Sequence, residues 1–425
     1  MPEDLPGDEE ATRIICLVKN KQPLGATIKR NEITGEIFIA RVIHGGLADR
    51  SLLHPGDRIV EVNGFPVGGM EPEQVIQQGT VTFKVVPITE RPVHNHTMLY
   101  VRAMVDYSPQ HDPAIPCADA GMSFRKGDVL EIVDQTDVLW WQAQRLPRTT
   151  ACAGLIPSTN LLKRSQREFS WSQPYHQHAC VQTCRHSHST TEPSCHTRCS
   201  SSCCRALNSP YEEVVLYQRD LQDAHRPIAL SPSGVGVNDL RRHLIEMNPS
   251  IFQGAVPTTR APKGYEESGR EYFFTSREIF NNMVYNNFLE YGEHKGNLYG
   301  TSIESVREVL NSGKICVIDI EPNVRTHELR AYVIYVKPPP LERLRQTRQD
   351  SYITTNYYVN RTFKDEDFQE MEEAARKIES HYWQFFDHVI VNDELQDSCV
   401  QLLTAVRKAQ DEPQWVPASW IRSTT

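Results

Sequence analysis

The chain has 425 residues, which is more than one hydrophobic core usually fills, so we expect several domains. Its composition, 39% hydrophobic and 23% charged, excludes a wholly disordered or fibrous protein. A net charge of −9 gives no overall attraction to nucleic acid, and we expect none as a partner. Neither a signal-peptide pattern nor an apolar run of about 20 residues is present, so we expect a cytoplasmic protein.

Short β-rich runs and glycine turns over residues 13–88 predict a compact β domain, after a disordered start at residues 1–12. Within it, KNKQPLGATIK (residues 19–29) and PGDRIVEVNG (residues 55–64) resemble PDZ domains. In that family a Leu-Gly loop presents backbone N–H groups to the terminal carboxylate of a peptide, which adds a strand to the sheet. The resemblance implies that the carboxylate loop and the start of the pairing strand are Leu24, Gly25, Ala26 and Thr27.

The far wall of this peptide groove should be a helix that begins near Pro72. The helix lacks the histidine by which PDZ domains recognise a Ser or Thr hydroxyl, so we expect an apolar residue at that ligand position. It is also shorter than the family pattern, because Gly79 follows Gln78 directly, and Ser51 precedes Leu52 where a glycine is expected between them. The alternative is a PDZ fold that is kept for packing and binds ligands weakly.

Residues 98–162 form a second β-rich region that resembles an SH3 barrel, and residues 210–218 are predicted to be its final strand. SH3 domains bind proline-rich helices on an aromatic shelf, for which Tyr107, Trp140 and Pro157 are in place. Val105 and Asn160 stand where two shelf tyrosines are usual, which argues against binding of proline-rich peptides. Trp141 is interpreted as a core residue.

Ser, His, Cys and Thr dominate residues 163–209, which we interpret as a low-complexity insertion that splits the barrel. Six of the 11 cysteines lie between Cys180 and Cys204. Thiolates and imidazoles are zinc ligands, but their spacing here is irregular and no metal is expected. Zinc binding and palmitoylation of Cys203 or Cys204 remain as alternatives to a flexible insertion.

Strands alternate with helical patterns over residues 225–422, which predicts a parallel α/β domain. SPSGVGVNDL (residues 231–240) stands between a strand and a helix, which is the context of a phosphate-binding P-loop. Gly234 and Gly236 are kept, but Ser231 replaces the leading glycine, Val237 the lysine and Asn238 the hydroxyl residue. Because valine offers no charge to a triphosphate, we expect no ATP binding, no catalysis and no cofactor.

The rest of this region resembles the GMP-binding half of guanylate kinases. The matching residues are Arg260, Lys263, Tyr272, Glu290, Tyr299, Thr301, Asp319 and Glu321. In that family arginines and tyrosines hold the phosphate, whereas acidic and hydroxyl residues read the guanine. Lys263 replaces an arginine and so loses the bidentate fork. In scaffold relatives the cleft binds proteins, some of them phosphorylated, although the tyrosines could also serve only to pack this subdomain.

The order of PDZ, split SH3 and guanylate-kinase-like regions resembles the membrane-associated guanylate kinase scaffolds, and in particular the membrane-palmitoylated-protein subfamily. The segments SQREFSWSQPY, PYEEVV, SGVGVNDLRR and EPQWVPASWI carry the second resemblance. It implies a peripheral scaffold at the plasma membrane and cell junctions that organises polarity or junction complexes. Expected partners are C-terminal peptides of membrane proteins, other scaffold and cytoskeletal adaptors, and phosphopeptides. The rival hypothesis is an active guanylate kinase that phosphorylates GMP with ATP.

Overall fold

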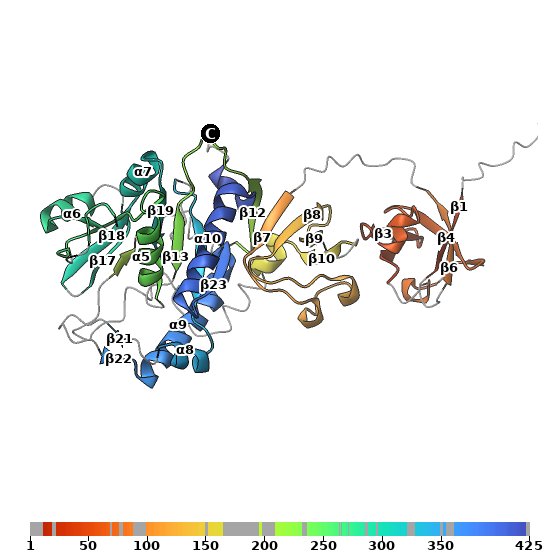
Figure 1. Ribbon diagram of the computed structural model, residues 1–425. Helices are drawn as coiled ribbons and strands as arrows, with labels where there is room; N and C mark the ends of the chain where they lie inside the picture. Colours follow the sequence, from red (N-terminus) through yellow and green to blue (C-terminus); the bar gives the residue numbers. More distant parts are fainter. Residues whose placement is uncertain are drawn as a thin grey trace, which may run out of the picture. The chain divides into compact units, whose positions relative to one another are not determined.

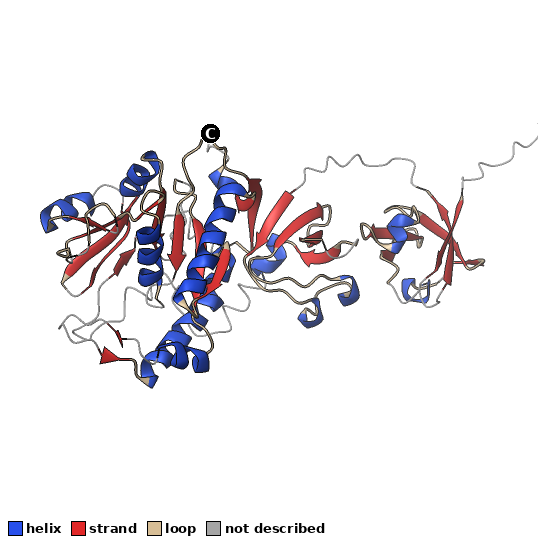
Figure 2. Ribbon diagram, viewed as in Figure 1, coloured by secondary structure: helices blue, strands red, loops and turns tan. Residues whose placement is uncertain are grey.

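The chain divides into two compact units, Met1–Glu168 and Phe169–Thr425. The structure is a computed structural model (Figures 1 and 2). It describes residues 12–18, 23–68, 70–75, 80–87, 99–148, 152–164, 195–197, 209–231, 236–262, 264, 266–270, 272–284, 288–294, 296–320, 328–348, 352–353 and 361–421. None of the helices in these ranges is both long and apolar enough to cross a membrane.

An antiparallel sheet with the strand order β1-β6-β4-β3-β2 forms the first domain, with the short β5 paired to β4. Its elements are β1 (Arg13–Val18), β2 (Ala26–Arg30), β3 (Ile37–Val42), α1 (Leu47–Arg50), β4 (Arg58–Val62), β5 (Phe65–Pro66), the 3₁₀ helix η1 (Pro72–Val75) and β6 (Thr80–Val86). Alternate residues along β6 are buried, as the two-residue period of a strand requires when one face covers a core. Strand β2 lies at an edge of the sheet.

The described part of the expected groove helix is the 3₁₀ helix η1 (Pro72–Val75). Residues 76–79, the rest of the segment in which the sequence predicts a helix, lie outside the described residues, and β6 begins at Thr80.

The second domain contributes an antiparallel meander, β10-β9-β8-β7, which agrees with the β-rich region predicted over residues 98–162. The elements are β7 (Leu99–Ala103), the 3₁₀ helices η2 (Pro109–His111) and η3 (Ala118–Ala120), β8 (Val129–Asp134), β9 (Trp140–Leu146) and β10 (Gly154–Pro157).

In the second unit a parallel sheet with the order β14-β19-β13-β20-β23 confirms the predicted α/β domain. Its strands are β13 (Ile228–Ser231), β14 (Phe252–Gln253), β19 (Ile315–Asp319), β20 (Tyr332–Lys337) and β23 (His388–Val391). The helices beside it are α5 (Val237–Met247), α7 (Ile303–Asn311), α8 (Leu341–Arg348), α9 (Asp365–Tyr382), η4 (Trp383–Phe385) and α10 (Leu395–Asp411) (Figure 1).

Both faces of this parallel sheet are buried, which explains its near-continuous apolar strands. Within β13, Ile228 and Leu230 pack on one face with residues of α5 and α10, whereas Ala229 packs on the other with residues of α7. The two helical layers therefore hold the carboxyl ends of β13 and β19 in fixed positions, and the candidate site is built there.

A smaller sheet with the order β11-β17-β18-β15-β16 lies in the same unit. Its elements, with the neighbouring short hairpin, are β11 (Cys195–Thr197), β15 (Val256–Thr258), β16 (Tyr272–Phe274), α6 (Arg277–Val284), β17 (Phe288–His294), β18 (Asn297–Ser302), β21 (Tyr352–Ile353) and β22 (Arg361–Thr362). Three residues of the predicted low-complexity insertion thus form a strand, which pairs with β17. The rest of the cysteine and histidine cluster lies outside the described residues.

The strand predicted at residues 211–217 is β12 (Tyr211–Tyr217). It pairs antiparallel with β24 (Gln414–Pro417), which precedes the 3₁₀ helix η5 (Ala418–Trp420). The sequence did not predict this pairing between segments that lie about 200 positions apart. The assignment of β12 to the SH3 barrel stays a prediction.

Candidate functional site

The junction between β13 and α5, where the sequence predicts a degenerate P-loop, is described on both sides of residues 232–235. Ser231 ends β13 and is buried, Gly234 lies outside the described residues, and Gly236 has a φ of 86° at the start of α5. The Val237 side chain is fully buried in the core beside Leu240. The position that would carry the lysine therefore points an apolar side chain away from any ligand, and Asn238 is exposed.

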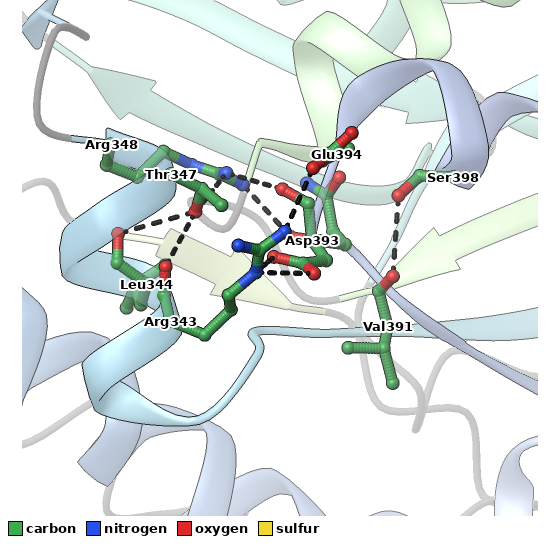
Figure 3. A network of polar contacts seen from close by, with 9 residues as sticks. Arg343, Leu344, Thr347, Arg348, Val391, Asp393, Glu394 and Ser398 are labelled. Carbon is green, nitrogen blue, oxygen red and sulfur yellow. Dashed lines mark hydrogen bonds and ion pairs between the residues drawn. The ribbon is translucent and has the colours of Figure 1, made fainter.

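The loop after β23, which carries Asn392, contacts this junction directly. A Cβ atom added to Gly236 would lie 2.7 Å from Nδ2 of Asn392, so a larger residue would have to displace that side chain and would also be strained by the positive φ. Arg348 of α8 donates to the backbone oxygens of Asn392 at 3.0 Å and Asp393 at 2.8 Å. These hydrogen bonds attach the Asn392 loop to α8; Figure 3 shows Arg348 and Asp393.

Arg343 reinforces the same attachment from the preceding turn of α8. Its Nε atom donates to both carboxylate oxygens of Asp393, at 3.1 and 2.9 Å, and its Nη2 atom donates to Glu394 at 2.9 Å (Figure 3). The groups are largely exposed, so each pair contributes little on its own. Together with the Arg348 bonds they fix the register of α8 relative to the loop.

In and beside the small sheet, the structure brings together three residues predicted to face a phosphate, Arg260, Tyr272 and Tyr299. The guanidinium carbon of Arg260 lies 5.2 Å from the centre of the Tyr272 ring, within cation–π range. The rings of Tyr272 and Tyr299 meet edge to face at 6.4 Å. Lys263, the fourth residue of the predicted set, lies outside the described residues.

Arg260 is held in place by a carboxylate that the sequence did not single out. Its two terminal nitrogens donate to Glu266 at 2.8 and 2.9 Å, a bidentate pair in which the Glu266 side chain is 7% exposed. These hydrogen bonds raise the pKa of Arg260, so the guanidinium stays charged. Burial raises the pKa of Tyr299, although the Arg260 charge opposes this shift, so its phenol is neutral and can donate at neutral pH.

The predicted guanine-reading residues are only partly assembled. Thr301 is buried on β18 and is the cross-strand partner of Glu290 on β17, whereas Glu321 lies outside the described residues. Asp319, at the end of β19, forms an ion pair of 2.9 Å with Arg241 of α5. Sequence reasoning missed Arg241, although a charged residue on the helix face that carries Val237 and Leu244 was a signal that it needs a buried partner.

In the first domain, the predicted carboxylate loop directly precedes β2. Gly25 has a φ of 71°, and the Leu24 side chain is buried in the core. Ala26 and Thr27 begin the edge strand β2. Arg30, at the end of β2, bonds Glu71 and the Met70 carbonyl, both at 2.9 Å, and so ties the strand to the turn that carries η1.

The predicted aromatic shelf of the second domain is wrong in one respect. Trp140 is 6% exposed and packs with Ile43 of the first domain, whereas Trp141 is only half-buried, so the roles expected for the two tryptophans are reversed. Pro157 is also buried, and Tyr107 is half-buried with its hydroxyl on Asp112 at 3.1 Å. The predicted groove residues do not form an exposed shelf.

The reason lies in the segment that follows β3. The Gln142 side chain donates to the Val42 carbonyl at 2.9 Å and accepts from the His44 N–H at 2.9 Å, while the Ala153 N–H donates to the His44 carbonyl at 2.9 Å. These bonds place Ile43 against Trp140 within the first unit. Sequence reasoning treated each domain alone and could not foresee this contact.

Comparison with known proteins agrees with this architecture. The PDZ domain family model matches residues 15–89, and the guanylate kinase family model matches residues 224–409. The chain is 56% identical to MAGUK p55 subfamily member 4 of Rattus norvegicus over 96% of this chain and 98% of that protein. It is 51% identical to the Mus musculus protein of the same name, over 100% of this chain and 78% of that protein. Against MAGUK p55 subfamily member 7 of Xenopus tropicalis, the identity is 41% over 100% of this chain and 78% of that protein.

The fold and the altered P-loop therefore define a multidomain scaffold with PDZ, SH3 and guanylate-kinase-like domains. More narrowly, the chain belongs to the MAGUK p55 subfamily.

Proposed function

We propose that this chain is a non-enzymatic scaffold that associates peripherally with the plasma membrane at cell junctions and organises polarity or junction complexes. Its PDZ domain binds C-terminal tails of membrane proteins, and its guanylate-kinase-like domain binds protein partners, among them phosphorylated peptides. Other scaffold and cytoskeletal adaptor proteins are further partners.

The observation that carries this proposal is the burial of Val237. A P-loop kinase needs a cation at this position because the transferred phosphoryl group carries its charge on oxygen atoms. Here the side chain lies in the hydrophobic core between the sheet and α10. Ser231 and Asn238 remove the leading glycine and the magnesium hydroxyl as well, so the ATP half of the cleft lacks each group that catalysis would use.

The monophosphate half supports binding without catalysis. Arg260, which is paired with Glu266, supplies a guanidinium group, and the hydroxyl groups of Tyr272 and Tyr299 are further polar groups, all from one end of the small sheet. These three groups match the charge and the acceptor oxygens of a phosphomonoester, which is the chemistry of phosphoserine and phosphothreonine side chains.

In the PDZ domain, the loop at Leu24 and Gly25 and the edge strand β2 support capture of a C-terminal peptide by strand addition. Because the histidine that recognises a hydroxyl group is absent, a ligand with an apolar residue is favoured where many PDZ ligands carry Ser or Thr.

Two assays on the full chain test the proposal. In a coupled assay with ATP, magnesium and GMP we expect no turnover, whereas rates of about 1 to 100 per second, which are ordinary for kinases, would establish the rival enzyme.

In a binding assay, a phosphoserine peptide library should bind more tightly than its unphosphorylated counterpart. Tyr299→Phe should reduce that preference, whereas Tyr291→Phe on the neighbouring strand should not. Equal binding of the two libraries would refute the phosphopeptide part of the proposal.

Membrane-tail binding is tested separately with a C-terminal peptide array. Peptides with a free carboxylate should bind the full chain, and the same peptides with an amidated C-terminus should not, because the amide removes the charge that the Gly25 loop receives. Binding that is indifferent to amidation would exclude PDZ-type recognition.

A further inference from the structure

Arg241 connects both halves of the cleft and is almost fully buried, with 3% of its side chain exposed. Its Nη1 atom donates to Asp319 at 2.9 Å. Its Nη2 atom donates to the Tyr272 hydroxyl oxygen at 2.9 Å and lies 3.4 Å from Oδ1 of Asn238. A buried guanidinium is tolerated only when it is paired and hydrogen-bonded, so these partners fix its position.

The first consequence concerns Asp319, the carboxylate expected to read guanine. Arg241 occupies one of its oxygens and offsets its charge. Without Arg241, the negative charge of Asp319 would repel an anionic ligand at Tyr272. The ion pair therefore prevents Asp319 from reading a guanine base. It also offsets a charge that would repel an anionic ligand.

The second consequence concerns the direction of the hydrogen bond to Tyr272. A guanidinium can only donate, so the phenol oxygen of Tyr272 must accept from Arg241. The phenol proton is then left to be donated to another group. The guanidinium carbons of Arg260 and Arg241 also lie 5.2 and 5.0 Å from the centre of the Tyr272 ring, so both cations are within cation–π range of it.

We propose that Arg241 is a positioning residue that sets Tyr272 as a hydrogen-bond donor for a phosphomonoester and withdraws Asp319 from guanine recognition. The proposal rests on the binding function proposed above and narrows its ligand class. A phosphomonoester could come from a phosphorylated serine or threonine or from a nucleotide. The engagement of Asp319 favours the phosphorylated side chain, because the nucleobase loses a carboxylate that would read it.

The test uses the full chain with Arg241→Met, which keeps much of the side-chain volume but removes the charge. Arg242→Met is the matched control, since Arg242 is the next residue of α5, is 42% exposed and pairs with Asp239 of its own helix. The probes are a peptide library with one fixed phosphoserine, its unphosphorylated counterpart, GMP and AMP, measured by surface plasmon resonance on the immobilised protein.

For wild-type protein and Arg242→Met, we expect phosphopeptide binding in preference to the unphosphorylated library, and equal weak affinities for GMP and AMP. Arg241→Met should weaken phosphopeptide binding by about tenfold, the size of one charge-assisted hydrogen bond. It should leave binding of the unphosphorylated library and of C-terminal PDZ peptides unchanged. Arg241→Lys keeps the charge without the fork and should fall between the two.

A double-mutant cycle separates positioning from loss of structure. If Arg241 acts through the Tyr272 hydroxyl, Tyr272→Phe and Arg241→Met together should be no weaker than the worse single variant. Additive losses, unchanged phosphopeptide binding in Arg241→Met, or a wild-type preference for GMP over AMP would each overturn the inference while the binding function stands. Wild-type protein that does not distinguish the two libraries would overturn the proposed function and the inference together. If Arg241→Met does not fold, Arg241→Lys and the Tyr272→Phe cycle with it give the same decision.

Discussion

Leu52 has a backbone φ of 63°, a left-handed conformation that costs a residue with a Cβ atom about 1 to 2 kcal/mol. Its side chain is 63% exposed, so packing does not repay the strain. The conformation ends the short helix α1, where the Leu52 N–H donates to the Asp49 carbonyl at 3.0 Å. This is the turn at which the sequence lacks an expected glycine, and the leucine has taken over the backbone geometry that glycine would supply.

Leu52→Gly should therefore raise the free energy of unfolding of the first unit, by up to about 1 kcal/mol once the greater freedom of unfolded glycine is subtracted. Urea unfolding of the full chain, followed by a probe in the first unit, measures the change. Ile33→Gly is the control, because Ile33 is 95% exposed but does not have a positive φ. That variant should be neutral or destabilising, and a gain equal to that of Leu52→Gly would contradict the strain account.

For single residues, the sequence identified those that belong to a known motif. It missed those whose role depends on contacts that form only in the folded chain. Tyr272, Tyr299 and Arg260 could be chosen because a known family uses those positions, and the structure brings them together. Arg241 was missed, because a charged residue on a helix is usually solvated; its place on the apolar face of α5 was a signal, but its partner at the end of β19 lies far along the chain. Trp140 was misjudged for the same reason, since its burial depends on Ile43 of another domain.

Helix α7 begins directly where β18 ends, and one residue makes the change of direction possible. Ser302 is the last residue of β18 and the N-cap of α7, and its Oγ atom accepts the Ser305 N–H at 3.0 Å. The Ser305 hydroxyl lies 2.7 Å from the same oxygen. The cap satisfies a helix donor that is buried, and it positions the strand that carries Tyr299 and Thr301.

Ser302→Ala should lower the free energy of unfolding by about 1 kcal/mol, the usual loss for an N-cap serine, with a further loss because Ser305 is buried. Thermal or chemical unfolding of the second unit provides the measurement. Ser312→Ala is the comparison, because the Ser312 hydroxyl bonds only the Val309 carbonyl at the other end of α7. Equal losses in the two variants would argue against the cap as the cause.

The sequence predicted well those helices and strands that have a strong hydrophobic period. Strand β12 lies within the strand expected at residues 210–218, and the buried Phe368 and Ala375 of α9 follow the helical period of their sequence. The pairing of β12 with β24 and of β11 with β17 could not be predicted, because a strand's partner depends on contacts across long separations in sequence and not on its own pattern.

At the scale of the whole molecule, the order of domains was readable because each region has its own composition and its own hydrophobic period. The two units have separate cores, one beneath the sheet of β1 to β6 and one around the parallel sheet of the second unit. A scaffold requires this separation, since each binding site must remain competent when another is empty or occupied. We therefore expect damage to the carboxylate loop of the first unit to leave phosphopeptide binding by the second unit unchanged.

Gly25→Val tests that independence. Gly25 has a φ of 71°, which valine adopts only with strain of about 1 to 2 kcal/mol, so the loop should change conformation and lose its carboxylate-binding geometry. Gly35→Val is the matched control, because Gly35 has the same φ of 71° and no atom within 4 Å of an added Cβ, but lies in the turn between β2 and β3. Both variants carry the same backbone strain. Only Gly25→Val should lose binding of C-terminal peptides, and both should bind the phosphoserine library as wild type does. If Gly25→Val also weakens phosphopeptide binding and Gly35→Val does not, the two sites are coupled and the chain works as a single switchable unit.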